Sequence, residues 1–212
     1  MDTVTFGALS AFAITCLVIE LTPGPNMAYL ALLSASKGRR AGFAAVVGIA
    51  LGLLIVGVAA ALGVATLIAN SPALYQALRW GGIVYLLWLA YEGFRGDEET
   101  SPGTAKAAAP DTTYFVRGLV TNLLNPKAGL FFVAVLPTFL NEANGLIAQA
   151  VTLSLVYVAI ATIIHSIIVV LADAARPWLE DERRSAFVRR ALSLLLVGIA
   201  VWLFFTTRRI EP

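Results

Sequence analysis

Residues 20–27 read ELTPGPNM, and they interrupt the first hydrophobic segment of the chain, which extends over residues 4–36. As one continuous α-helix, this segment would be about 50 Å long at 1.5 Å per residue. The hydrocarbon core of a bilayer is only about 30 Å thick. If residues 4–36 cross a membrane, the helix therefore has to break or tilt steeply, and the two prolines and the glycine of this stretch predict a break.

The composition is that of an integral membrane protein. Of the 212 residues, 59% are hydrophobic and 13% are charged, whereas soluble domains carry about 25% charged residues. The apolar runs repeatedly reach the length of about 20 residues that one helical span needs, and strands of a membrane barrel would instead alternate over about ten residues. The sequence therefore predicts an all-α membrane protein.

Charge and cysteine usage exclude several classes of partner. A net charge of +2 gives no reason to expect nucleic-acid binding, and a single cysteine, Cys16, allows neither an intramolecular disulfide nor a cysteine-based metal site. No nucleotide-binding loop is present, and we expect no cofactor and no metal.

Asp2 precedes the first apolar run without a basic segment, so we also expect no cleaved signal peptide.

Six spans are predicted, and their flanking charges predict the topology. The spans cover residues 4–36, 41–69, 72–95, 114–140, 146–172 and 186–207. Eleven basic residues lie near the first, third and fifth connections: Lys37, Arg39, Arg40, Arg95, Lys106, Arg117, Arg176, Arg183, Arg184, Arg189 and Arg190. Only Arg79, Arg208 and Arg209 fall on the opposite side. Because basic residues favour the cytoplasmic side, both termini are predicted to lie outside.

The chain divides into two halves of three spans each. Residues 96–113 have the composition of a linker, and they separate residues 1–95 from residues 114–212. Since three is odd, the halves enter the membrane from opposite sides, as in transporters built from inverted repeats. At an offset of 100 residues, TPGPNMAYL (22–30) aligns with NLLNPKAGL (122–130), so each half has a proline break in its first span.

The two breaks are candidate halves of one binding site. Proline lacks an N–H group, so Pro23 and Pro25 are expected to leave the carbonyls of Ile19 and Leu21 without helical donors, and Pro126 that of Asn122. Irregular backbone at membrane depth persists only where protein or a water-filled cavity covers it, and helix N-termini favour anionic groups. The alternative is a proline kink that only shapes helix packing.

The ionisable residues inside the spans are the other candidates for function. Glu20 and Lys127 lie beside the two breaks, and each needs a partner because a charge buried in the bilayer is costly. We predict that the two approach each other and face the solute, with Lys127 receiving a carboxylate and Glu20 an ammonium or a coupled proton. Alternatively, they only neutralise each other. His165 is expected to bond a carbonyl or to relay protons, and Asp173 to pair locally with Arg176.

Several motifs together resemble the LysE/RhtB family of amino-acid exporters. They are LTPGPNM (21–27), KGRRAGF (37–43), GIALG (48–52), WGGIVYLLWLAYEGFR (80–95) and FVRGLVTNLLNPKAGLFFVAVLP (115–137). The resemblance implies efflux of amino acids or related small metabolites across the bacterial inner membrane, coupled to an H⁺ or Na⁺ gradient, by a homodimer. The family motifs cover Pro23, Gly24, Pro25, Asn26, Asn122, Asn125, Pro126 and Lys127.

The predicted solute site combines these motif positions with residues chosen on physical grounds. It consists of Glu20, Thr22, Pro23, Gly24, Pro25, Asn26, Asn122, Asn125, Pro126 and Lys127. An ion or metal exporter of similar architecture remains an alternative, although the acidic and imidazole groups are scattered. An intramembrane enzyme is a further alternative, but it needs a nucleophile with a positioned base, and His165 has no evident serine or cysteine partner.

Overall fold

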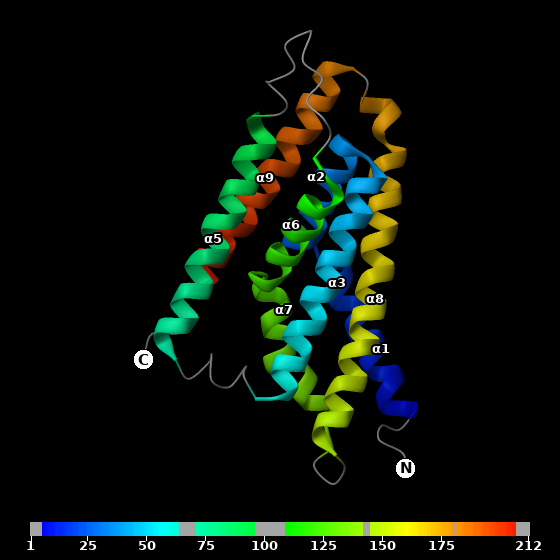
Figure 1. Ribbon diagram of the computed structural model, residues 1–212, viewed down its shortest axis with the longest axis vertical. Coiled ribbons are helices and arrows are strands. Elements are labelled where there is room, and N and C mark those ends of the chain that lie inside the picture. Colours follow the sequence, from blue (N-terminus) through cyan, green and yellow to red (C-terminus); the bar gives the residue numbers. More distant parts are fainter. Residues whose placement is uncertain (1–5, 64–70, 96–108, 142–144, 180, 207–212) are drawn as a thin grey trace.

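The described part of the chain is helical throughout in a computed structural model, which describes residues 6–63, 71–95, 109–141, 145–179 and 181–206 (Figure 1). The elements are α1 (Phe6–Leu21), α2 (Pro25–Lys37), α3 (Arg39–Ala61), α5 (Pro72–Arg95), α6 (Asp111–Leu123), α7 (Pro126–Leu130), the π-helix η1 (Phe131–Val135), the 3₁₀ helix η2 (Leu136–Phe139), α8 (Leu146–Ala174), the 3₁₀ helix η3 (Arg176–Leu179) and α9 (Glu182–Thr206). The predicted all-α class is confirmed for these residues. The linker 96–113 lies mostly outside them.

Both predicted breaks are present. The chain bends by 57° between α1 and α2, and by 48° between α6 and the stretch Pro126–Phe139. Among the described residues, α3 and the stretch Leu146–Trp178 are long and apolar enough to cross a membrane, and each bent pair is as well if it counts as one span. α5 and α9 have 24 and 25 residues but do not meet the same criterion. The six-span count therefore stays a prediction.

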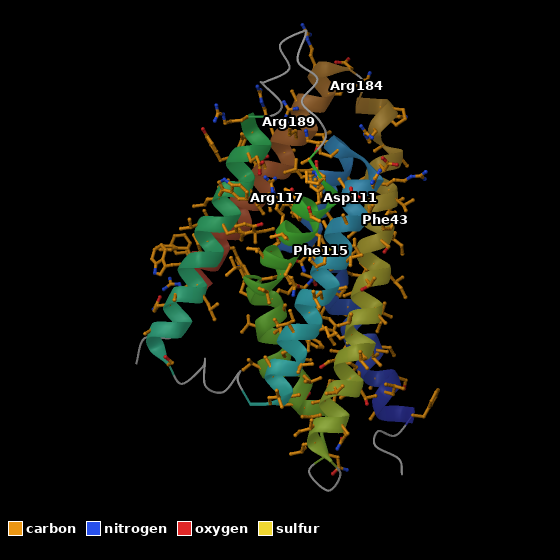
Figure 2. All side chains as sticks on the ribbon, in the orientation of Figure 1. Phe43, Asp111, Phe115, Arg117, Arg184 and Arg189 are labelled. Carbon is orange, nitrogen blue, oxygen red and sulfur yellow. The ribbon has the colours of Figure 1, made fainter. Side chains whose placement is uncertain are left out.

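Successive segments run in alternating directions along the long axis of the molecule (Figure 1). α1 and α2 run upward in this view, α3 downward, α5 upward, α6 to η2 downward, α8 upward and α9 downward. The α2–α3 junction, the C-terminal end of α5 and the N-terminal ends of α6 and α9 consequently share the upper end, where Arg184 and Arg189 are labelled (Figure 2). The basic ends of the helices thus gather at one end of the molecule.

Two close helix contacts fix the centre of the fold. α3 packs against both α6 and α8, α8 also packs along α1 and α2, and α5 packs against α9. A Cβ atom added at Gly48 would collide with the backbone carbonyl of Phe115, and one added at Gly118 with that of Ala45. Glycines let membrane helices approach to backbone contact, and these two therefore hold α6 and its break firmly against α3.

Aromatic side chains join α1, η1 and α8. The ring of Phe131 stacks on that of Tyr157 at 3.9 Å between centroids, and Phe12 lies 5.8 Å from Phe131. All three side chains are buried. Because α1, η1 and α8 each contribute one ring, this cluster fixes the position of Tyr157 between the two halves of the chain.

Candidate solute-binding site

Each break is a short turn followed by a helix that begins with proline. α2 begins at Pro25 and α7 at Pro126, at the first helical position, where a missing N–H costs no hydrogen bond. Gly24 precedes α2 in an extended conformation. Asn125 precedes α7, and its side-chain oxygen accepts a hydrogen bond from the backbone N–H of Lys127 at 3.0 Å.

The expectation that the breaks leave bare carbonyls is wrong for two of the three. The N–H of Thr22 donates to the carbonyl of Ile19 at 3.1 Å, and the N–H of Asn125 donates to that of Asn122 at 2.9 Å. A tight turn from residue i to residue i−3 replaces the helical bond that proline cannot make. The polarity of the breaks therefore comes mainly from side chains.

The structure brings the two breaks into contact. The Nδ2 group of Asn26 donates to Oδ1 of Asn122 at 2.9 Å, and the ammonium of Lys127 donates to the carbonyl of Thr22 at 2.8 Å. A Cβ atom on Gly24 would lie 3.2 Å from Cδ of Lys127, so the glycine leaves room for the lysine. Each break thus supplies one group that the other binds.

Two polar atoms at this contact have no hydrogen-bond partner in the described part of the chain. They are Oδ1 of Asn26 and Nδ2 of Asn122. Asn26 is 5% exposed and Asn122 is fully buried. Nearly all buried polar atoms in proteins are hydrogen-bonded. An unpaired acceptor and an unpaired donor side by side therefore form a site that a ligand with both kinds of group can satisfy.

Glu20 lies in a second buried polar cluster, which it forms with two residues of α8. The Tyr157 hydroxyl donates to Oε1 of Glu20 at 2.6 Å, and Nε2 of His165 lies 3.4 Å from Oε2. All three residues are at most 4% exposed. Both ring nitrogens of His165 lack a hydrogen-bond partner among the described residues, so the expected bond to a carbonyl is not found there.

Glu20 and Lys127 do not form the direct pair that the sequence predicted. Within the described structure, Glu20 contacts Tyr157 and His165, whereas the ammonium of Lys127 binds the carbonyl of Thr22. The carboxylate points from α1 toward α8 and the lysine reaches the end of α1 instead. The sequence analysis missed Tyr157. The sequence indicated Tyr157 only through its position eight residues before His165, a spacing that places both side chains on one face of a helix.

The other predicted positions contribute less directly. The Thr22 hydroxyl donates back to the carbonyl of Val18 at 3.2 Å, so Thr22 offers only its backbone to the site, and Pro23 is exposed. Asp173 is 3.6 Å from Arg176, as predicted, and also accepts from the N–H of Arg39 at 3.1 Å. Asp173 therefore caps the N-terminus of α3 and is not in contact with either break in the described structure. The described residues contain no group of three or more His, Cys, Asp or Glu side chains able to hold a metal.

Residues 17–207, which include both breaks and the Glu20 cluster, match the family described as LysE type translocator. The chain belongs to the LysE family. This LysE-family protein is thus a membrane protein of a translocator family and not an enzyme, and the resemblance drawn from its motifs is confirmed.

Curated relatives match nearly the whole LysE-family chain. It is 30% identical over 204 residues to a leucine efflux protein of Enterobacter sp. (strain 638), covering 92% of this chain and 95% of the relative. It is 26% identical over 196 residues to a homoserine/homoserine lactone efflux protein of Salmonella typhi, covering 92% and 95%. It is 25% identical over 203 residues to the uncharacterized membrane protein YrhP of Bacillus subtilis (strain 168), covering 92% and 97%. No solved structure matches it.

Proposed function

We propose that this protein is a secondary transporter that exports amino acids or related small metabolites across the bacterial inner membrane. Membership of a translocator family and the efflux activities named for two relatives support this proposal. The observation that carries it is the contact between the two breaks, where Asn26 and Asn122 bond each other and keep one buried acceptor and one buried donor unused.

The unused atoms match the two ends of an amino acid. The α-ammonium group carries three N–H donors, one of which would bind Oδ1 of Asn26, and the α-carboxylate would accept from Nδ2 of Asn122. A buried polar group without a partner costs about 1–3 kcal/mol, and solute binding would remove that cost at both atoms. Lys127 would stabilise the carboxylate from the second break.

Glu20 would carry the coupling ion, H⁺ or Na⁺, at the cluster with Tyr157 and His165. The carboxylate lies in the last turn of α1, one residue before the break. A change of its charge would therefore alter the contacts that hold α1 against α8 at the point where the chain bends. Through this contact, ion binding at Glu20 would favour one bend of the chain between α1 and α2 over another.

The architecture that fits this function is a pair of inverted repeats, residues 1–95 and 114–212, joined by a cytoplasmic linker at 96–113 and with both termini periplasmic. Helix packing supports this arrangement. In the proposed repeat, α1 and α2 are equivalent to α6 and α7, α3 is equivalent to α8, and α5 to α9. The equivalent helices α3 and α8 pack together, as do α5 and α9, and the contact of α3 with α6 has its counterpart in the contact of α8 with α1 and α2. Rocking of one repeat against the other would open the site alternately to each side. The proposed assembly is a homodimer.

Flux in proteoliposomes tests the proposal. Purified protein is reconstituted, the vesicles are loaded with labelled leucine, threonine, homoserine or other amino acids, and the exit of unmodified solute is followed. We expect saturable exit of at least one amino acid, and a loss of about tenfold or more in Asn26→Ala and Asn122→Ala, since each removes a hydrogen bond to a charged group.

The control variant is Thr152→Ala, because the Thr152 hydroxyl is exposed and, among the described residues, donates to the carbonyl of Ala148 in the preceding turn of α8. It should transport like the parent. Correctly reconstituted protein that moves no amino acid, or variants at Asn26 and Asn122 that transport like Thr152→Ala, would overturn the proposal.

A further inference from the structure

A second polar contact joins α5 to α6 nearer the basic end of the molecule. One guanidinium nitrogen of Arg117 lies 2.9 Å from both carboxylate oxygens of Glu92. The side chains are 28% and 44% exposed, respectively. The guanidinium also lies 5.1 Å above the ring centroid of Trp88. Arg117 is labelled in the upper half of the molecule, beside α6 (Figure 2).

Polar groups connect this ion pair with the contact between the breaks. The carbonyl of Arg117 accepts from the hydroxyls of Tyr85 at 3.1 Å and Thr121 at 2.6 Å, and these two hydroxyls are 3.5 Å apart. Asn122 follows directly in the sequence and bonds Asn26. The half-exposed ion pair at Arg117 therefore lies five residues, about 7.5 Å along the axis of α6, from the buried Asn122.

A buried hydroxyl of α2 is unused. The side chain of Tyr29 is 3% exposed, and its hydroxyl has no hydrogen-bond partner in the part of the chain that the structure describes. An unpaired buried hydroxyl is a further polar group that a solute can satisfy.

We propose that Arg117 and Glu92 form an entrance site that selects zwitterionic amino acids. The solute's α-carboxylate binds the guanidinium of Arg117, and its α-ammonium binds the carboxylate of Glu92, so that the protein's ion pair is exchanged for two pairs with the solute. The inference rests on the proposed function, and it places the entrance at the end that carries the basic connections.

The exchange explains why the site distinguishes zwitterions from singly charged analogues. A guanidinium presents donors in a fork that matches a carboxylate, and Trp88 holds it in place through a cation–π contact. A zwitterion leaves neither protein charge without a partner. A 2-hydroxy acid lacks the ammonium and leaves Glu92 unpaired, whereas an amine lacks the carboxylate and leaves Arg117 unpaired.

A second ion pair at the same end provides the matched control. Arg40 lies 2.9 Å from Asp111 and joins α3 to α6, and the two side chains are 87% and 48% exposed. Exposed ion pairs contribute little to stability. Arg40→Gln and Asp111→Asn therefore also neutralise a guanidinium and a carboxylate that form an ion pair with α6, but they leave Glu92 and Arg117 unchanged.

The test uses inside-out membrane vesicles and, as competitors of a transported amino acid, its 2-hydroxy-acid and decarboxylated amine analogues. We expect Glu92→Gln to raise the half-saturation concentration of the amino acid about tenfold and to strengthen inhibition by the 2-hydroxy acid, which then leaves no carboxylate unpaired. Arg117→Gln should raise the half-saturation concentration similarly and strengthen inhibition by the amine, which then leaves no guanidinium unpaired. Arg40→Gln and Asp111→Asn should leave the half-saturation concentration and the inhibition by both analogues unchanged.

A thermal-shift measurement on detergent-solubilised protein supplies a readout that does not need transport. Millimolar amino acid should raise the Tm of Glu92→Gln less than it raises that of the parent and of Arg40→Gln, because the variant binds about tenfold more weakly. The entrance site would be overturned if Glu92→Gln and Arg117→Gln weakened binding of the amino acid and of both analogues equally, or if the Arg40 and Asp111 variants showed the same changes. Amino-acid flux through the parent would then still support the proposed function. A parent that moves no amino acid would overturn both.

Discussion

At the scale of single residues, the buried carboxylate of Glu20 depends on the Tyr157 hydroxyl. Tyr157→Phe removes a 2.6 Å bond to a charged group and should cost about 1.5–3 kcal/mol of stability. Tyr29→Phe is the matched control because the Tyr29 hydroxyl has no partner within the described structure, and it should be neutral or slightly stabilising. Unfolding in detergent measures both, and equal effects would show that the Glu20 contact is unimportant.

Glu20 and Lys127 bind different partners, so neutralising both should not restore function. Glu20→Gln weakens the contact with Tyr157 and His165, and Lys127→Met removes the bond to the Thr22 carbonyl. We expect each variant to lose transport and the double variant to stay inactive, because neutrality alone restores neither contact. Near-parent transport in the double variant would mean that the two charges only balance each other. Proteoliposome flux with reconstituted variants provides the measurement.

At the scale of the element, the break between α1 and α2 is the feature most open to test. Replacing Pro23 and Pro25 together with alanine restores two backbone N–H donors, so that α1 can continue into α2 with a smaller bend. We expect the protein to insert and fold but to lose transport, because Asn26 then turns away from Asn122. Flux and detergent stability are measured together, with Pro177→Ala in the exposed η3 helix as the control. Full flux in the double variant would show the bend to be a packing feature.

At the scale of the whole molecule, the alternating directions of the helices and the gathering of basic residues at one end predict the membrane orientation (Figure 1). Reporters fused after residue 102 and after residue 212 test it. The first should be active only in the cytoplasm and the second only outside, because basic connections stay inside. A C-terminal reporter active only in the cytoplasm would contradict the six-span arrangement and the inverted repeat with it.

The sequence alone determined the features that depend on composition and on local backbone chemistry. Predicted residues 72–95 coincide with α5, and both breaks lie at the predicted prolines. Proline acts on its own turn whatever surrounds it, so no tertiary information was needed. The same local reasoning failed for the carbonyls of Ile19 and Asn122, since turns that the chain forms after the break supply their donors.

Only the tertiary structure decided which polar groups meet. Tyr157 contacts Glu20 across 137 residues of sequence, and Asn26 contacts Asn122 across 96. The reason is that a helix facing lipid on one side and protein on the other is apolar all round. Its sequence period therefore does not show which face is inside. Helix packing turns Glu20 toward α8 and Lys127 toward the end of α1, so the two groups, which the sequence analysis paired, bind different partners.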